Sequence, residues 1–321
     1  MYEQYYGLTE RPFELSPDPR FLFLSKGHRE ALSHLRYGLS GRPGVTVLVG
    51  EAGTGKTTLV RAALHATAGP RATIVHLSNP TLTRAEFYEY VASGFGFSAD
   101  AAASKSTFLR ELERALAARA ASGGVLALIV DEAQSLPHEL LEEIRLLTNT
   151  DGGGRTAAVA LVGQPELADR LNEPRLRQLK QRVALRCELP PLDLRDTAAY
   201  IASRVRIAGG NADLLFTRDA IIAIHEYSRG IPRIMGVIAD NALVSGFAAD
   251  VKPVGRDLIL EVCRDFALDQ AASTTAPRAS NATPAGELPW TASDARVRAD
   301  QKAEAQPMFS GLNRPRRFSF F

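Results

Sequence analysis

A glycine-rich segment near position 50 has the residue types and spacing of a phosphate-binding loop. It follows a short apolar run, 45–49, and precedes a helical pattern that begins near Lys56. The glycines let the backbone turn tightly, so that consecutive N–H groups can point at an anion. Lys56 can place an ammonium between the β- and γ-phosphates, and the Thr57 hydroxyl can ligate Mg²⁺. The pattern G-x-x-x-x-G-K-[ST] between strand and helix therefore predicts a nucleotide site. The predicted nucleotide-binding residues are Gly50, Glu51, Ala52, Gly53, Thr54, Gly55, Lys56, Thr57 and Thr58.

Two adjacent carboxylates end a second apolar run. The run 125–130 is continuously apolar, and Asp131 and Glu132 follow it directly. Asp131 is expected to hold Mg²⁺ through water, and Glu132 to polarise the attacking water. A solvated turn is the alternative, but the phosphate-binding loop upstream favours the catalytic interpretation. The pair therefore predicts an ATPase that uses ATP and Mg²⁺ and hydrolyses ATP rather than only binding it.

Two further polar residues are expected to face the γ-phosphate. Gln164 follows the apolar run 157–162, and a polar residue at the tip of such a strand can act as a sensor. The alternative for Gln164 is a helix-entry turn, which Pro165 would also supply. Arg233 follows a glycine and a proline that suit the start of a helix. It is expected to face back towards the nucleotide and to report the γ-phosphate to a helical lid.

A basic cluster precedes the run 183–189. It contains Arg175, Arg177, Lys180 and Arg182. In oligomeric ATPases an arginine at this place reaches into a neighbour's active site and stabilises charge on the transferred phosphoryl group. Arg182 is the first choice for that catalytic role and Arg177 the second, while an ordinary basic helix face is the alternative.

These residues require a scaffold that brings several strand ends together. Apolar runs at 45–49, 72–77, 125–130, 157–162 and 183–189 predict five strands, and helices are expected from near Lys56 and at about 83–95 and 106–121. Alternating strands and helices predict an α/β fold with a five-stranded parallel sheet. The residues Pro190 and Pro191 mark a boundary, after which only helices are expected, at about 193–208, 217–227, 232–247 and 256–268.

The predicted organisation has four parts. Residues 1–44 form an entry segment packed on the core, 45–191 the α/β ATPase domain, 192–269 a helical lid domain, and 270–321 a disordered tail rich in Ala, Ser, Thr and Pro. The entry segment is expected to be extended at first and then to form a helix that Ser25 caps, with Ala31, Leu32, Leu35 and Leu39 on one face. The tail ends in a basic, aromatic stretch, 313–321. A docking peptide, a nucleic-acid or membrane contact, and an untethered tail all stay open for that stretch. His28 and His34 are expected to be surface or capping residues rather than ligands.

Composition narrows the functional class further. With a formal net charge of +2 over 321 residues, the chain as a whole is not basic enough to suggest that it binds polyanions. Any nucleic-acid surface must therefore be a local patch. Two cysteines are too few for a disulfide framework and fit a reducing cytoplasm. The start of the chain has no signal-peptide pattern, and no run approaches the roughly 18 apolar residues of a membrane-spanning helix. A cytoplasmic protein is expected.

The motifs together resemble the ExeA/GspA family of AAA+ ATPases. The resemblance covers about residues 1–268 and places the chain in the initiator-like clade, near the transposition ATPases TniB and TnsC. It implies an AAA+ core followed by a helical lid. The stretches that carry it are 5–13, 16–19, 28–32, 50–58, 131–134, 162–167, 176–182 and 230–233.

This resemblance implies an oligomeric ATPase, a hexamer or filament assembled with ATP. It would power or gate assembly of a secretion or exopolysaccharide/exosortase-type complex, with peripheral association at the inner membrane. Secretion members of the family continue into a transmembrane helix and a peptidoglycan-binding domain; this chain is expected to lack both, which weakens a secretin-assembly role. The alternative is a DNA-binding ATP switch of the transposition-regulator type, with Arg175, Arg177 and Lys180 on the DNA. A monomeric kinase is weaker, because the sequence has no acceptor-site signature.

Overall fold

A computed structural model describes residues 1–14, 19–40, 44–67, 72–78, 81–153, 156–266 and 268. All of these residues belong to one compact unit. The tail predicted at 270–321, with its basic aromatic end, lies outside them. Within the described ranges, no helix combines the length and the apolar character needed to cross a bilayer.

Five parallel strands form a single sheet in the order β2-β3-β4-β1-β5. Every residue of β1 and β4 is buried, which explains their continuously apolar sequences. The α/β fold with a five-stranded parallel sheet is therefore confirmed. Because β3, β4 and β1 are neighbours, the loops that leave their carboxyl ends lie side by side. The strands are β1 (Val45–Gly50), β2 (Ala72–Leu77), β3 (Val125–Val130), β4 (Ala158–Gly163) and β5 (Val183–Leu189).

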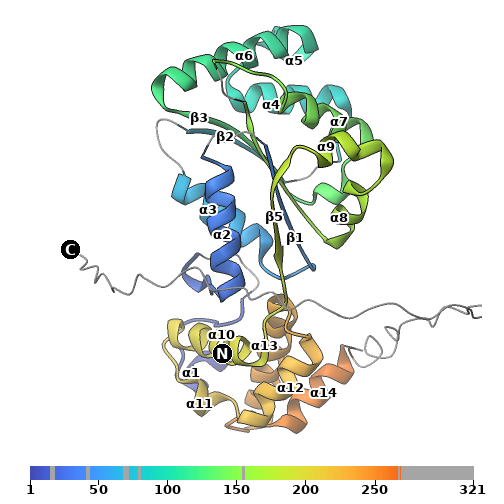
Figure 1. The fold of residues 1–321 in the computed structure, drawn as a ribbon. Helices are drawn as coiled ribbons and strands as arrows, with labels where there is room; N and C mark the ends of the chain where they lie inside the picture. The colour runs from blue at the N-terminus through green and yellow to red at the C-terminus, as the bar shows by residue number, and fades with distance from the viewer. Residues whose placement is uncertain are drawn as a thin grey trace, which may run out of the picture. The chain divides into compact units, whose positions relative to one another are not determined.

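Helices cover both faces of this sheet (Figure 1). On one face, α2 (Lys26–Gly38) and α3 (Lys56–Thr67) bury Leu35 and Leu59 against Leu48 of β1. The opposite face is covered by α4 (Arg84–Phe95), α6 (Lys105–Ser122), α7 (His138–Leu147), α8 (Pro165–Leu171) and α9 (Arg177–Lys180). The two apolar layers hold the strand ends rigidly in place.

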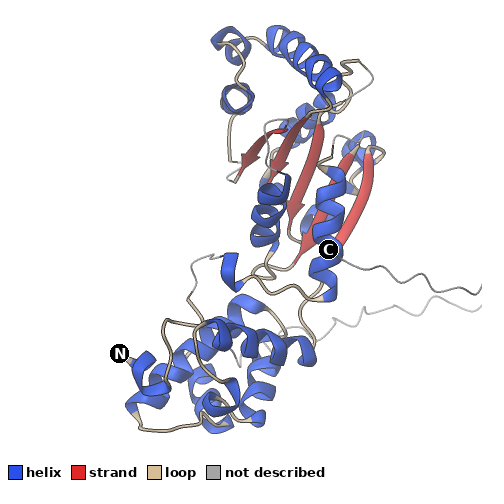
Figure 2. Ribbon diagram, turned by 90° about the vertical axis from the view of Figure 1, so that its left-hand side faces the viewer, coloured by secondary structure: helices blue, strands red, loops and turns tan. Residues whose placement is uncertain are grey.

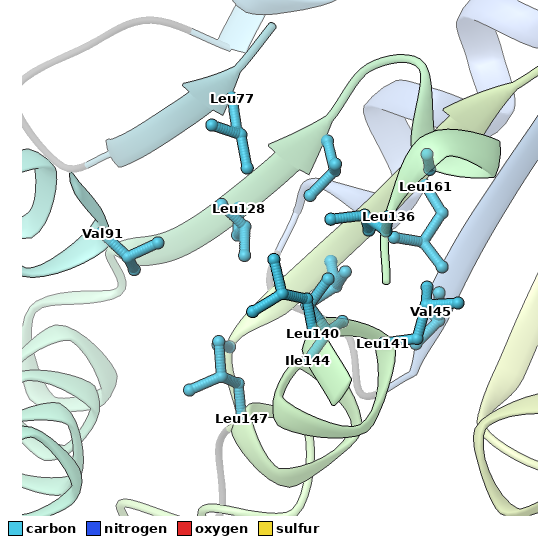
Figure 3. Packing of buried hydrophobic residues seen from close by; sticks show 14 of the residues in the cluster. Val45, Leu77, Val91, Leu128, Leu136, Leu140, Leu141, Ile144, Leu147 and Leu161 are labelled. Carbon is cyan, nitrogen blue, oxygen red and sulfur yellow. The ribbon is translucent and has the colours of Figure 1, made fainter. Parts of the chain in front are cut away.

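Helix α7 lies outside the elements predicted from the sequence. Its residues Leu140, Leu141, Ile144 and Leu147 repeat at helical spacing and are all buried. Figure 3 shows them packed close to Leu128 of β3 and to other residues of the same core cluster. This spacing is a readable helix signal, since side chains three and four residues apart share one helix face. The short helix α5 (Ala99–Ala103) also lies outside the predicted elements.

The helical part after the sheet consists of helices joined by loops (Figure 2). The helices are α10 (Leu194–Ile207), α11 (Ala212–Leu215), α12 (Arg218–Ser228), α13 (Pro232–Ala248) and α14 (Arg256–Asp265). The helices α10, α12, α13 and α14 start and end within a few residues of the predicted bounds, whereas the short helix α11 lies outside the predicted elements. Residues of all five helices share one apolar cluster. The division into separate domains at 191 and 192 remains a prediction.

The entry segment differs from the expectation of an extended stretch on the α/β core. It begins with a helix, α1 (Tyr2–Tyr6), and Tyr2, Tyr6 and Phe13 are buried in the cluster of the helical part. The ring of Phe13 packs edge-on against Phe216. Only α2, later in the segment, packs on the sheet. The aromatic residues explain this arrangement, because they supply apolar area that the small helical cluster otherwise lacks.

Candidate nucleotide-binding site

The glycine-rich loop connects β1 to the first turn of α3. Gly53 and Gly55 have φ angles of 84° and 101°, in the left-handed region that favours glycine. At Gly50 a Cβ would lie 2.8 Å from the carbonyl oxygen of Leu189, so a larger residue has no room. The α3 N-terminus faces the loop, and the positive end of its dipole favours an anion there.

Lys56, at the start of α3, is buried with its ammonium inside the loop. Its Nζ donates to the carbonyl oxygens of Gly50 at 2.8 Å and Glu51 at 3.0 Å. Burial lowers the pKa of Lys56, while the carboxylates of Glu132 and Asp131 oppose that shift. The loop therefore holds a cation close to two carboxylates.

Thr57 and Asp131 meet at the junction of α3 and β3. The Thr57 hydroxyl donates to Asp131 Oδ2 at 2.7 Å, and the Glu132 backbone N–H donates to Asp131 Oδ1 at 3.0 Å. A hydroxyl beside a carboxylate is an oxygen donor set that suits Mg²⁺. No cluster of three or more His, Cys, Asp or Glu side chains occurs in the described ranges. Magnesium at this pair therefore requires further oxygens from phosphate and water, as is usual for this ion.

Glu132 is held by two amides. Gln134 Nε2 and Gln164 Nε2 donate to its Oε2 at 2.6 Å and 3.3 Å. The Gln164 backbone N–H in turn donates to Gln134 Oε1 at 3.1 Å. Gln164 thus lies beside the carboxylate, while its role as a sensor of the γ-phosphate stays a prediction. Gln134 was not among the predicted site residues, although it belongs to the motif that begins at Asp131.

The loop opens onto a cavity of about 560 Å³. Lys56, Thr57, Glu132, Gln164 and Arg233 all line it, so the structure brings these predicted site residues together. Its volume falls in the range usual for small-molecule sites. Its far side is largely aromatic, with Phe13, Phe21, Phe23, Tyr200 and Arg204.

Arg204 of α10 organises this aromatic side. Its Nη1 donates to the Tyr200 hydroxyl at 2.9 Å, and its guanidinium lies 4.8 Å from the centre of the Phe21 ring. Its Nε donates to the carbonyl of Pro12 at 2.5 Å. Sequence reasoning missed Arg204. The spacing from Tyr200 was readable as one helical turn, but the contacts with the N-terminal segment were not.

Of the two expected positions for His28, the structure shows the one at the cap of α2 and not the one on the surface. Only 4% of it is exposed, and its Nε2 lies 3.0 Å from the carbonyl oxygen of Thr54 in the loop. Its Nδ1 lies 2.7 Å from the Ser25 hydroxyl, and Ser25 caps α2. Burial lowers the pKa of His28. A neutral ring with its proton on Nε2 would donate to Thr54 and accept from Ser25, so His28 links α2 to the loop.

Arg233 lies in the first turn of α13, directly against the loop. Its backbone N–H donates to the Gly53 carbonyl at 3.2 Å. A Cβ on Gly53 would lie 2.8 Å from the Arg233 Cβ, so only glycine allows this approach. Pro232 occupies the first helical position, as expected. The helical part therefore contacts the nucleotide loop through main-chain atoms.

The basic cluster lies elsewhere. Arg175, Arg177, Lys180 and Arg182 are exposed, and none lines the cavity. The Arg182 carbonyl accepts from the Val45 N–H at 2.8 Å, which places this residue at the start of β1 and β5. Their proposed role across a subunit interface stays a prediction.

The fold and the site define a P-loop nucleotide-binding protein of the AAA class. Residues 39–171 match the model of the AAA domain family, so this part of the chain is an AAA domain. It is also similar to a protein of Aeromonas hydrophila described as General secretion pathway protein A. The two are 40% identical over 250 residues, which are 77% of this chain and 45% of that protein. This similarity confirms the resemblance predicted from the motifs, although the chain spans only about half the length of its relative.

Solved structures with a similar fold include ORC and Cdc6 proteins. ORC2 of Aeropyrum pernix gives a TM-score of 0.57 at 15% identity, over 80% of this chain and 71% of that chain. Cdc6p from Pyrobaculum aerophilum gives 0.55 at 18% identity, over 79% and 70%. A chain of Drosophila ORC bound to DNA gives 0.58 at 18% identity, over 83% and 67%. At such low identity these similarities show the fold alone.

Proposed function

We propose that the chain hydrolyses ATP to ADP and phosphate in the cavity beside Lys56. The observation that supports this most directly is the position of Glu132, a carboxylate lining the cavity next to the Thr57–Asp131 pair. ATP would supply the phosphoryl group, and Mg²⁺ held by Thr57 and Asp131 would offset its negative charge. A site for binding alone has no need of the additional carboxylate.

Each residue of the site has its own role in the proposed reaction. Glu132 orients a water molecule and accepts its proton as the water attacks. Lys56 and the N–H groups of the loop stabilise phosphate oxygens, and they need no reorganisation because the glycines already position them. Arg233 and Gln164 report the presence of the γ-phosphate, one to the helical part and the other to the sheet. The aromatic side of the cavity, organised by Arg204, receives the base by stacking.

The proposal includes assembly with further copies of this chain, in which the basic cluster of one subunit contacts the nucleotide site of the next. In this proposal Arg182 of one subunit completes the site of its neighbour, with Arg177 and Arg175 as the alternatives. The assembly powers or gates a partner complex of the kind named for the secretion relative, at the cytoplasmic face of the inner membrane. The similarity over 77% of this chain supports that context.

A DNA-dependent ATP switch is the second candidate. The observation that favours it is the exposed basic cluster, which has no acidic residue from 174 to 187. Binding through phosphate contacts would weaken steeply with salt. Affinity for duplex DNA measured between 50 and 200 mM salt separates the candidates, because a protein-directed ATPase has no such dependence.

Two variants test the ATPase proposal. Glu132→Gln keeps the shape of the side chain and its contacts with Gln134 and Gln164, but it removes the base. It should bind ATP and hydrolyse it roughly 10²-fold more slowly. Lys56→Ala should lose binding of a fluorescent ATP analogue while its circular dichroism is unchanged. Turnover near the wild-type rate in Glu132→Gln would contradict the assigned role, and unchanged affinity in Lys56→Ala would contradict the loop assignment.

A further inference from the structure

Gln134 contacts both the proposed base and the tip of β4. Its Nε2 donates to Glu132 Oε2, and its Oε1 accepts from the Gln164 backbone N–H. The Gln164 side chain donates to the same Glu132 oxygen. One carboxylate oxygen thus receives two amide N–H groups. Among the residues that the structure describes, none hydrogen-bonds to the other oxygen, Oε1.

The Gln134 amide is itself tightly placed. The side chain of Arg170 in α8 donates to the main-chain carbonyl oxygen of Gln134. A Cβ on Gly163 would lie 2.6 Å from Gln134 Oε1, so the amide fits at the tip of β4 because that strand ends in glycine. Glu132 has a φ of 52°, which non-glycine residues adopt rarely. Such a conformation persists where the surroundings determine it, and it occurs often at functional sites.

We propose that Gln134 is a positioning residue for the general base, an assignment that rests on the proposed function. The amide anchors Oε2 of Glu132 and leaves Oε1 to accept the proton of the attacking water. Because the same amide also bonds the main chain of Gln164, a displacement of the β4 tip moves the carboxylate. Gln134 therefore couples the residue that senses the γ-phosphate to the residue that activates water.

Two substitutions separate positioning from general stability. Gln134→Ala removes both amide contacts. Gln134→Glu keeps the shape and the acceptor for Gln164, but it places a second carboxylate against Glu132. The two like charges repel each other, so Glu132 should be displaced and kcat should fall although the shape of the side chain at 134 is kept. Ser135→Ala is the matched control, because Ser135 is the exposed neighbour in the same turn.

The measurements are kcat, KM and the Kd of an ATP analogue for the full chain. In Gln134→Ala we expect kcat to fall roughly 10²-fold, the scale for misplacing a reacting group, with KM and Kd within about twofold. Ser135→Ala should behave as wild type.

The outcomes separate the inference from the proposed function. Wild-type kcat in Gln134→Ala or in Gln134→Glu overturns the role of Gln134 and leaves the ATPase proposal standing. A loss of ATP affinity as large as the loss of kcat also overturns it, since Gln134 would then support the loop rather than the base. If the wild-type protein does not hydrolyse ATP, the proposed function fails and this inference fails with it.

Discussion

The backbone N–H of Arg233 donates to the carbonyl oxygen of Gly53 at 3.2 Å, which joins α13 of the helical part to the nucleotide loop. The contact does not depend on the type of side chain at 233, but it does depend on glycine at 53. Nucleotide binding at the loop and the placement of α13 therefore share one small set of main-chain atoms. Under the proposed function, this link would let the helical part respond to nucleotide.

Gly53→Ala should damage nucleotide binding more than a comparable substitution elsewhere. The added Cβ would meet the Arg233 Cβ at 2.8 Å and Ile231 Cγ2 at 3.1 Å, besides the strain of a positive φ. Gly96→Ala is the matched control, because Gly96 has a φ of 74° and nothing within 4 Å of its Cβ. Backbone strain alone costs about 1–2 kcal/mol. In calorimetric titration with an ATP analogue, the Kd of Gly53→Ala should be at least about tenfold higher than that of the wild type, whereas the Kd of Gly96→Ala should be unchanged. Equal affinities in the two variants would contradict the shared contact.

The buried imidazole of His28 predicts a pH-dependent stability. Burial lowers the pKa of His28 in the folded protein, so the unfolded chain takes up this proton first as the pH falls. The contribution of His28 to the free energy of unfolding should therefore be fully present above the unfolded pKa of about 6.5. It should be lost as the pH drops towards the folded pKa. His28→Gln should remove that part of the slope, at most about 1.4 kcal/mol per pH unit. Urea unfolding at pH 7.5 and 5.5 measures it, and the control is His65→Gln, because His65 is an exposed histidine. An identical slope in wild type and His28→Gln would show that the ring is protonated without penalty.

Glu143 predicts a second transition at lower pH. Burial by itself raises the pKa of Glu143, but hydrogen bonds from Lys105 and Tyr88 and the charge of Arg84 outweigh it and hold the pKa below its ordinary value. This group stabilises the fold above the unfolded pKa of about 4.3, and its contribution is lost as the pH falls through the lower folded pKa. Glu143→Gln should lower the free energy of unfolding by about 1–3 kcal/mol at pH 7. Glu142→Gln is the matched control, since Glu142 is half exposed and pairs only with Arg145. Equal stabilities of the two variants by urea unfolding would contradict the role of Glu143.

Local patterns were sufficient to predict the sheet and the loop, but not the contacts that complete the site. The strands were readable because continuous apolar runs are typical of buried parallel strands. The contact of Gln134 with Gln164 spans 30 positions, that of His28 with Thr54 spans 26, and that of Arg204 with Pro12 spans 192. Such contacts depend on strand order and on the path of the N-terminal segment. No single stretch of sequence contains that information.

The last prediction concerns assembly. If Arg182 acts on the site of a neighbouring subunit, Arg182→Ala protein should bind ATP normally and hydrolyse it poorly. Because Arg182 is exposed and its side chain lines no part of its own cavity, the substitution leaves that cavity intact. Where measured, an arginine supplied in trans contributes roughly 10³–10⁵ in rate.

Mixing Arg182→Ala with Lys56→Ala protein should restore part of the activity. The Arg182→Ala subunit keeps an intact loop, and its neighbour donates the missing guanidinium. Arg177→Ala and Arg175→Ala need the same test, with retained ATP binding as the control for folding. ATP should also promote oligomers in light scattering, because a ligand that contacts two subunits stabilises their association. Wild-type turnover in all three variants, together with a monomer at every ATP concentration, would exclude a shared site.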